Sequence, residues 1–541
     1  MRDQQEMRCE REDLREILDR GACYLGIELG STRIKGVLID TKHRPLASGS
    51  YDWENQLQDG YWTYPLDQVE QGLQTCFARL NEEVRRLCGR PIRRLAGMGV
   101  SAMMHGYLAF DAEDRLLTPF RTWRNTNAKE ASERLTERFQ YNIPERWSIA
   151  HLYQAVLEHE PHVAEIAWIA TLASYVHYRL TGLHVLGVGD ASGMFPIATD
   201  EHAYRPDLLA SFDELVHAER YSWRISDILP ALRYAGEDSG TLTEQGARFL
   251  DPSGTLEAGI PLCAPEGDAG TGMVATNSVR ELGGNVSAGT SIFAMIVLPH
   301  QLSRLYRAID PVTTPSGKPV AMVHANNCTS DLDAWIRLFA DALKRLGLDV
   351  PKARLYDAFY QAALEGEADG GGILTYNYLS GEFIADLKEG RPLLVRMPDA
   401  KMDLANFARV LIFSTMATLR MGMTILDREG IRLKRLLGHG GLFKTPRVGQ
   451  RLMAAALNVP VAVMASAAEG GAWGIACLAA YRVAKEEGES LEDYLDQKVF
   501  ADAEASLEEP RPNDVKGFAA FMERYQKGLS VEREAVRALD C

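Results

Sequence analysis

Apolar and polar positions form two similar patterns that lie nearly half the chain apart. Each consists of two apolar runs around a short turn, with the sequence GST at 30–32 and GTS at 289–291. The apolar runs cover residues 24–29, 34–40, 285–288 and 292–298. Apolar runs split by such a turn are typical of a β-hairpin, so we expect one hairpin in each half. The turns are 289 − 30 = 259 residues apart, which favours an internal duplication, with a chance match as the alternative.

Helical spacing of apolar residues recurs along the chain after each predicted hairpin. We expect helices at 66–87, 161–180, 332–346, 353–364, 405–426 and 448–457. Alternating strands and helices indicate an α/β fold. The apolar pattern is interrupted at 276–278, and no low-complexity linker follows. We therefore expect an N-terminal extension at 1–20 and two domains, 21–277 and 278–541, packed around a cleft, where ligands often bind.

Composition narrows the class of protein. Hydrophobic residues make up 46% and charged residues 25% of the 541 residues, as in ordinary globular proteins. The net charge of −15 argues against nucleic acid or an anionic membrane as the main partner. No apolar stretch is long enough for a transmembrane helix, and the charged N-terminus does not resemble a secretory signal. The eight cysteines form no CxxC pair, so we expect a reducing, cytoplasmic location.

The first candidate for chemistry is the stretch GIELGST at 26–32. A carboxylate at a strand end, here Glu28, can hold a metal ion, and the turn after it offers hydrogen-bond donors to phosphate. The alternative is an ordinary hairpin with a solvated glutamate.

The second candidate is GDAGTG at 267–272, which follows a short apolar run. A carboxylate held at a buried strand end, here Asp268, can accept the proton of a substrate hydroxyl during phosphoryl transfer. The flanking glycines permit close approach of the backbone. The alternative is that Asp268 caps a helix that begins near Ala269.

Two further motifs are weaker. GHGGLF at 438–443 precedes a predicted helix, and glycines there would let a flat ligand or a phosphate lie against the backbone, or would only form a tight turn. VSAMMHG at 100–106 contains a lone histidine beside two methionines, which is more often packed structure than a ligand contact. No GxxxxGK[ST] phosphate loop is present.

The order of these motifs resembles the FGGY carbohydrate kinases, a family of the actin/Hsp70/sugar-kinase fold, from about residue 24 to residue 480. The matching segments are ELGST at 28–32, YRLTG at 178–182, DASG at 190–193, SAGTS at 287–291, YLSGE at 378–382, GG at 440–441 and EGGA at 469–472. The resemblance implies two actin/Hsp70-like (ribonuclease H-like) domains that flank a central cleft. It also implies ATP and Mg²⁺ as cofactors and a homodimer as a plausible assembly.

The resemblance also implies roles for individual residues. Asp268 would be the catalytic base, and Glu28 and Asp268 would hold the metal. The sugar would contact Met104, His105, Trp123, Asn125 and Asp268. ATP would bind to Gly30, Ser31, Thr32, Arg33, Gly289, Thr290, Ser291, Gly440, Gly441, Leu442 and Thr445. The MHG at 104–106 resembles the xylulokinase branch, which favours a ketopentose such as xylulose or ribulose over glycerol.

Three positions depart from the family pattern. Glu28 stands where an aspartate is usual, Asn125 and Asn127 replace the charged pair of W-x-D-x-R, and Ala269 replaces an amide after the catalytic aspartate. These departures keep two alternatives open. One is a kinase of a different polyol or deoxy-ketose, and the other is a catalytically degenerate sensor that binds sugar or nucleotide.

Overall fold

A computed structural model describes residues 13–464 and 470–539. The chain divides into two compact units, and neither is continuous in sequence. Unit 1 comprises Met1–Val279, Pro311–Pro319 and Ala468–Asp502. Unit 2 comprises Arg280–Asp310, Val320–Ala467 and Ala503–Cys541. Two segments from within 278–541 are therefore grouped with unit 1.

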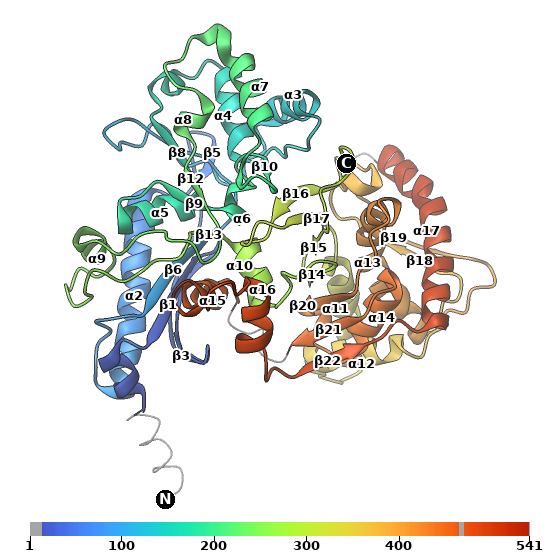
Figure 1. The fold of residues 1–541 in the computed structure, drawn as a ribbon. Coiled ribbons are helices and arrows are strands. Elements are labelled where there is room, and N and C mark those ends of the chain that lie inside the picture. The colour runs from blue at the N-terminus through green and yellow to red at the C-terminus, as the bar shows by residue number, and fades with distance from the viewer. Residues whose placement is uncertain (1–12, 465–469, 540–541) are drawn as a thin grey trace, which may run out of the picture. The chain divides into compact units, whose positions relative to one another are not determined.

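Unit 1 is built on a five-stranded sheet of order β13-β6-β1-β2-β3 (Figure 1). Its strands are β1 (Cys23–Leu29), β2 (Arg33–Asp40), β3 (Pro45–Asp52), β6 (Gly97–Ala102) and β13 (Glu266–Gly267). β1 and β2 are antiparallel, whereas β6 runs parallel to β1 and β13 parallel to β6. The carboxyl ends of β1, β6 and β13 therefore meet at one edge of the sheet, where ligands of α/β proteins commonly bind.

The remaining elements of unit 1 are short strands and helices. The strands are β4 (Gln56–Gln58), β5 (Tyr61–Thr63), β7 (Leu108–Phe110), β8 (Trp168–Ala170), β9 (Val185–Gly187), β10 (Ile197–Ala198), β11 (Ala203–Tyr204) and β12 (Ala231–Arg233). The helices are α2 (Leu66–Cys88), α3 (Lys129–Phe139), α4 (Ser148–Leu157), η1 (Pro161–Glu165), α5 (Leu172–Thr181), α6 (Val188–Ala191), α7 (Pro206–Val216), η2 (His217–Glu219), α8 (Ile225–Ile228), α9 (Glu244–Leu250), α10 (Asp268–Ala275), α15 (Gly470–Ala484), α16 (Leu491–Tyr494) and η5 (Leu495–Val499).

Two helices cover opposite faces of this sheet, because successive side chains of a strand point to opposite faces. Leu25 and Ile27 of β1 share a hydrophobic core with α2. Gly26, between them, faces α15, where an added Cβ would lie 2.0 Å from the Ala472 carbonyl oxygen. The backbone of α15 thus approaches β1 so closely that only glycine fits at this position.

Unit 2 is built on a seven-stranded sheet of order β16-β17-β15-β14-β20-β21-β22, in which residues 311–313 of β16 come from a segment grouped with unit 1. Its strands are β14 (Gly283–Ala288), β15 (Ile292–Val297), β16 (Asp310–Thr313), β17 (Pro319–Ala325), β20 (Arg435–His439), β21 (Val461–Met464) and β22 (Ala505–Glu508), and a separate pair is formed by β18 (Ile373–Tyr376) and β19 (Leu393–Arg396). β14 pairs with β15 antiparallel and with β20 in parallel. This arrangement repeats that of β1 with β2 and β6.

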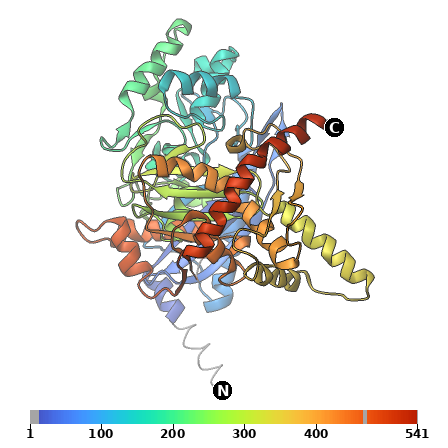
Figure 2. The same cartoon turned by 90° about the vertical axis from the view of Figure 1, so that its right-hand side faces the viewer.

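The helices of unit 2 surround one large core. They are α11 (Ser330–Arg345), α12 (Lys352–Ala363), η3 (Phe383–Ala385), α13 (Leu404–Arg428), η4 (Gly441–Phe443), α14 (Val448–Leu457) and α17 (Pro512–Ala538), the last seen as the long red helix in Figure 2. Among the described residues, α13 alone is long and apolar enough to cross a membrane. However, 78% of its most apolar window is buried inside the protein, as expected of a core helix.

Most of the predicted elements are confirmed. Both hairpins form, and the predicted helices at 66–87, 332–346, 353–364, 405–426 and 448–457 are present within two residues at either end. The predicted helix at 161–180 is wrong, because this segment contains η1, the strand β8 and α5 in succession. Of the N-terminal extension, residues 13–20 are helical and residues 1–12 lie outside the described residues.

Candidate active site

The turn of the first hairpin is fixed through its backbone. The Trp53 indole N–H donates to the Gly30 carbonyl at 2.7 Å, and the Tyr64 hydroxyl donates to the Ser31 carbonyl at 2.6 Å. Both rings are buried. The turn is therefore held in one conformation by side chains that lie outside it.

The side chains of this turn remain accessible. Thr32 and Arg33 are exposed, and Arg33 Nε donates to Asp52 at 2.6 Å. The Trp123 indole N–H donates to Ser31 Oγ at 3.2 Å, and the Trp123 side chain is 43% exposed. Trp123, predicted to contact sugar, thus lies beside the predicted phosphate turn and stays partly accessible to solvent.

Glu28, at the end of β1, is a carboxylate in an unfavourable environment. Burial, and then the charge of Asp268, raise its pKa to about 7, while the Ala472 backbone N–H and Lys35 act in the opposite direction. Lys35 is its partner across the hairpin. Gly471, at the start of α15, has no room for a side chain, since an added Cβ would lie 2.2 Å from Glu28 Oε1. The start of α15 is therefore part of this site.

Asp268 opens α10 directly after β13. Its Oδ1 accepts a hydrogen bond from the Met104 backbone N–H at 3.2 Å. The side chain has access to solvent. Surrounding protein nevertheless raises its pKa, an effect that the backbone N–H groups of Met104 and Ala269 oppose. The Asp268 carboxylate is thus oriented, accessible to solvent and more basic than that of an ordinary aspartate.

Glu28 and Asp268 are two mutually repelling carboxylates, and a hard divalent cation would relieve that repulsion. Mg²⁺ commonly takes one or two carboxylates, with waters and substrate phosphates as its other ligands. Within 13–464 and 470–539, no group of three or more His, Cys, Asp or Glu side chains could hold a metal ion by itself. The pair therefore fits Mg²⁺ with phosphate or water among its ligands.

A second carboxylate pair, Asp190 and Glu266, lies in the same part of unit 1. Glu266 accepts the backbone N–H groups of Asp190 at 2.9 Å and Gly189 at 3.3 Å, and Asp190 accepts the Thr171 hydroxyl at 2.7 Å. Burial first, then neighbouring carboxylates, raise the pKa of Glu266 to about 8 and that of Asp190 to about 7. In the sequence, Asp190 was noted only as part of the DASG segment that matches the family. Glu266 was not singled out, although Glu266 lies two residues before Asp268.

Met104 and His105 form the turn after β6, and both are buried. His105 has a φ of 67° and Gly106 a φ of 90°. His105 Nδ1 lies 3.2 Å from the Gly193 carbonyl oxygen, and burial lowers the pKa of His105 to about 3, so the ring is neutral. Met104 packs against Gly267, where an added Cβ would lie 2.1 Å from its Cγ. The structure therefore brings Met104, His105 and Asp268 together.

Asn125 is buried and its amide is used inside the protein. Its Oδ1 accepts the Trp62 backbone N–H at 2.8 Å, and its Nδ2 donates to the Trp62 carbonyl at 2.9 Å and to the Thr122 carbonyl at 3.1 Å. This pattern ties the segment around Trp123 to β5. A sugar contact through Asn125 would have to replace one of these bonds.

In unit 2, the turn of the second hairpin is held from one side. The Thr329 hydroxyl donates to the Gly289 carbonyl at 2.8 Å, and the Cys328 backbone N–H donates to the Thr290 carbonyl at 3.0 Å. Thr290 is exposed and Ser291 half-buried. No atom lies within 4 Å of the place where a Cβ of Gly289 would be, so the turn is open on that side.

The glycine-rich turn after β20 lies against β14. Gly440 has a φ of 96°, and an added Cβ would lie 2.5 Å from the Ala288 carbonyl oxygen. Gly440 and Gly441 are exposed, whereas Leu442 belongs to the core. Thr445 is buried and donates to Asp357 at 2.8 Å. Unit 2 thus brings Gly289, Gly440 and Gly441 together, and turns Leu442 and Thr445 into the protein.

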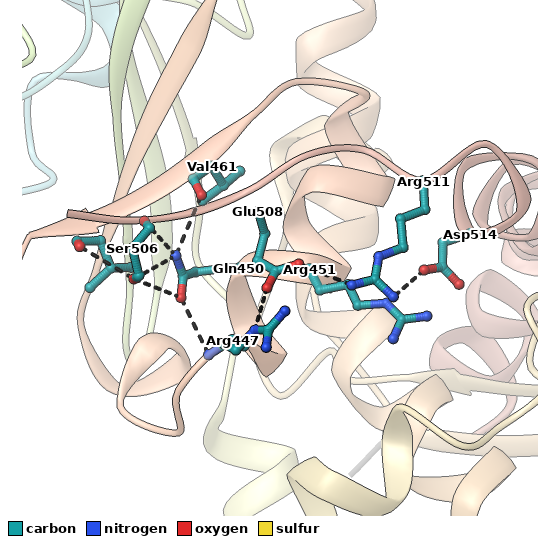
Figure 3. Close-up of polar contacts among 9 residues, drawn as sticks. Arg447, Gln450, Arg451, Val461, Ser506, Glu508, Arg511 and Asp514 are labelled. Carbon is teal, nitrogen blue, oxygen red and sulfur yellow. Dashed lines mark hydrogen bonds and ion pairs between the residues drawn. The ribbon is translucent and has the colours of Figure 1, made fainter.

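The helix after this turn, α14, is anchored by the C-terminal segment (Figure 3). Arg447 Nε donates to Glu508 of β22 at 2.6 Å, and Arg451 Nε donates to Asp514 of α17 at 2.8 Å. Gln450 donates to the backbone of β22 at 3.0 Å. These partners are about 60 residues apart in sequence, so no local spacing indicates them.

Two α/β units, each led by an antiparallel hairpin with a parallel strand beside it, have the arrangement of the actin/Hsp70 fold class. The carboxylates at one hairpin and the glycine-rich turn beside the other suit phosphoryl transfer. The chain belongs to the FGGY family of carbohydrate kinases. Residues 23–275 match the N-terminal domain of this family, and residues 284–483 match its C-terminal domain.

Several relatives are distant in sequence but match nearly the whole chain. Xylulose kinase of Haemophilus influenzae is 21% identical over 526 residues, which are 94% of this chain and 99% of that protein. A xyloylose kinase from Brucella ovis has the same fold, with a TM-score of 0.76, 19% identity, and coverage of 96% of this chain and 100% of that one. Plasmodium falciparum glycerol kinase with ADP reaches a TM-score of 0.73 at 14% identity, covering 93% and 97%.

The predicted fold class and the predicted sugar kinase activity are thereby confirmed. As a member of a carbohydrate kinase family, the protein uses ATP to phosphorylate a sugar. Solved structures of two differently named kinases match the fold almost equally well, so the fold alone does not select the sugar.

Proposed function

We propose that this kinase phosphorylates a ketopentose such as xylulose or ribulose, with Asp268 as the general base. The observation that carries the proposal is the accessible Asp268 carboxylate, oriented by the Met104 backbone N–H in a turn that also holds His105. The Met104–His105 pair favours a ketose. The relative that matches over 94% of this chain is named a xylulose kinase, which supports the same substrate class.

In the proposed reaction, a sugar hydroxyl attacks the terminal phosphorus of ATP while its proton passes to Asp268. The bond from that phosphorus to the bridging oxygen breaks, and ADP leaves with its electron pair. The hydrogen bond from the Met104 N–H to Oδ1 fixes the orientation of the carboxylate for this proton transfer. The raised pKa of Asp268 makes it a stronger base than a solvated aspartate. Neutral His105 and the ring of Trp123 would then contact the sugar without adding charge.

The nucleotide is proposed to use the backbone of both turns. In unit 2, Gly289, Thr290 and Ser291 would bind phosphate, and Gly440 with Gly441 would receive the adenosine. In unit 1, the turn at 30–33 would offer its hydroxyls and Arg33 to phosphate. Glu28 and Asp268 would hold Mg²⁺, which neutralises charge on the phosphate oxygens. The buried positions of Leu442 and Thr445 favour support of the turn over direct contact.

A coupled assay of ADP release with Mg-ATP tests the proposal. The panel contains D- and L-xylulose, D- and L-ribulose, fuculose, erythritol, erythrulose and glycerol. We expect one ketopentose to stimulate turnover most strongly, with Asp268→Asn almost inactive. Turnover with glycerol or erythritol alone would overturn the ketopentose assignment. ATP binding without stimulation by any sugar would favour the sensor alternative, and full activity of Asp268→Asn would remove the proposed base.

A further inference from the structure

A cluster of buried polar atoms without partners lies beside the proposed sugar contacts in unit 1. Among the described residues, eighteen buried side-chain nitrogen and oxygen atoms have no hydrogen-bond partner. Six of them belong to Arg121 (Nε and Nη1), Trp147 (Nε1), His151 (both ring nitrogens) and Glu160 (Oε1). The side chains of Arg121, Trp147 and His151 are completely buried. Buried polar atoms nearly always have partners, so this concentration indicates a ligand or ordered water.

The cluster is rigid, because its other polar atoms are already engaged. One Arg121 nitrogen pairs with Glu160, and the Arg121 guanidinium lies 4.3 Å from the centre of the Tyr61 ring. The bonded oxygen of Glu160 also lies 3.3 Å from His162 Nδ1, and His162 Nε2 lies 2.9 Å from the Tyr107 hydroxyl. The unpartnered atoms therefore have little freedom to turn toward one another.

The cluster adjoins the turn that orients Asp268. The Trp147 and His105 rings are stacked, with centroids 6.3 Å apart and planes at 19°. His151 lies near enough to His105 to disfavour its charged form, and His151 itself interacts with the charges of Arg121 and Glu160. The Gly106 backbone N–H donates to the Arg146 carbonyl at 3.3 Å, and the Ser148 hydroxyl donates to the Gly106 carbonyl at 2.5 Å, so this turn is connected to the start of α4.

The mixture of donors and acceptors selects the chemical class of the partner. Arg121 and Trp147 offer N–H groups, neutral His151 offers one donor and one acceptor, and Glu160 offers an acceptor. An apolar group would leave all of them unpaired. A carboxylate or phosphate ligand would be repelled by the negative charge of Glu160, which Arg121 and His162 stabilise. A hydroxyl group both accepts and donates, and so matches the set.

We propose that Arg121, Trp147, His151 and Glu160 form a hydroxyl-recognition subsite for the end of the sugar remote from the phosphorylated hydroxyl. The subsite rests on the proposed function and makes it more specific. In this role Arg121 and His151 determine which polyhydroxylated substrates are accepted. Asp268 remains the proposed general base.

The test compares a sugar with analogues that lack one terminal hydroxyl. Calorimetric titration and steady-state kinetics of the full chain would use D-xylulose, D-ribulose, 1-deoxy-D-xylulose and 5-deoxy-D-xylulose. A site built to bind a hydroxyl rejects the analogue without it, and we expect at least about 100-fold weaker binding of the remote deoxy analogue. The quantity compared is the Kd of the remote deoxy analogue divided by the Kd of the hydroxylated sugar. In Trp147→Phe and Arg121→Lys, this ratio should fall by about tenfold because the hydroxylated sugar loses affinity, with kcat little changed.

The control is Arg409→Met in unit 2. Arg409 is also a buried arginine, and its Nη1 has no hydrogen bond although it lies 3.6 Å from an Asp514 oxygen. Its loss therefore carries a similar structural cost without touching the subsite. It should keep the wild-type ratio.

Three outcomes would contradict the proposals in distinguishable ways. An unchanged ratio in variants that unfold at the wild-type temperature overturns the subsite and leaves the kinase assignment intact. So does a crystal structure with bound ketopentose in which the four side chains contact ordered water only. If wild-type protein neither binds nor phosphorylates any ketopentose, the proposed function itself fails and the subsite loses its basis.

Discussion

The two hairpins share a scaffold and differ in charge. Aligning Gly30 with Gly289 places Glu28 opposite Ser287. Glu28 pairs with Lys35 across its hairpin and Ser287 with Phe293 across the other. The turn in unit 1 therefore carries a carboxylate that interacts with Asp268, whereas the turn in unit 2 offers only neutral hydroxyl and backbone groups.

The strand beside each hairpin extends the same contrast. β6 runs parallel to β1 and leads into Met104 and His105, both buried. β20 runs parallel to β14 and leads into Gly440 and Gly441, both exposed. One topology thus supports proton and metal chemistry in unit 1 and an open backbone surface in unit 2. Function follows the side chains at equivalent positions more than it follows the scaffold.

The substitution Asp268→Asn has the largest expected effect, and it tests whether proton transfer depends on unit 1 while ATP binding depends mainly on unit 2. We expect kcat to fall by about 10²–10⁴-fold, because an amide cannot accept the hydroxyl proton. ATP affinity, proposed to depend mainly on unit 2, should change little. Steady-state kinetics and nucleotide titration of the same preparation measure both quantities. An equal loss of ATP affinity would contradict the division between the units.

Glycine substitutions test the two equivalent turns against each other. Gly440→Ala places a Cβ 2.5 Å from the Ala288 carbonyl oxygen at a φ of 96°. We expect a loss of about 1–3 kcal/mol in unfolding free energy and a higher KM for ATP. Gly106→Ala, at a φ of 90° and 2.7 Å from the Phe120 ring, should raise the KM for sugar instead.

The control for this pair is Gly441→Ala. Its Cβ would lie 3.8 Å from the nearest atom outside the adjoining residues, the Ala288 carbonyl oxygen, so stability should change by less than about 0.5 kcal/mol. Equal destabilisation by Gly440→Ala and Gly441→Ala, measured by thermal unfolding, would refute the steric explanation.

The carboxylates of unit 1 predict a pH dependence of stability. The folded-state pKa of Glu266 is about 8, above its ordinary value of 4.5. Between these values the folded state holds a proton that the unfolded state has released. Its stabilising effect is complete below pH 4.5 and is lost as the pH rises through 8, by up to about 1.4 kcal/mol per pH unit. Urea unfolding of metal-free protein at pH 5.5 and 8 should show this decrease.

Glu266→Gln keeps an acceptor for the backbone N–H groups of Gly189 and Asp190 and removes the titrating group. The variant should therefore lose stability less steeply as the pH rises. A slope identical to that of the wild type would show that Glu266 does not take up the proton.

The smallest expected effect concerns the edge of the sugar site. Trp123→Phe keeps an aromatic face and removes the hydrogen bond to Ser31 Oγ. Because this bond is solvent-accessible, we expect the KM for sugar to rise by no more than about threefold. Steady-state kinetics would measure it, and a change above tenfold would mean that Trp123 contributes more than a ring face.

The sequence predicted local structure well wherever one pattern dominates. The GST and GTS turns between apolar runs predicted both hairpins, and Leu66 marks the start of α2 both in the pattern and in the structure. The segment 161–180 failed because β8, only three residues long, pairs with β7 about 60 residues earlier. Its strand character comes from that distant partner and not from the local spacing.

Sequence patterns likewise indicated only those parts of the candidate site that have a local motif. Asp268 and Glu28 were found through glycine-rich neighbours in sequence. The sequence did not indicate Glu266 or the atoms of Arg121 that lack hydrogen-bond partners. Burial in the folded chain raises the pKa of Glu266 and leaves those Arg121 atoms without partners, and no local motif marks either effect. Asn125 shows the converse. Its place in the family motif implied a sugar contact, whereas the folded chain pairs its amide with the backbone of Trp62.

The discontinuity of unit 1 has a consequence for synthesis on the ribosome. α15 covers the β1 face at Gly26, yet Ala472 follows Gly26 by 472 − 26 = 446 residues. At typical elongation rates, roughly 20–90 s pass before that covering helix is made. During this interval β1 and β6 form a nascent sheet with one bare face. We therefore expect that chains truncated before residue 470 bind chaperones and are degraded, even though the sugar-contact residues have all been translated.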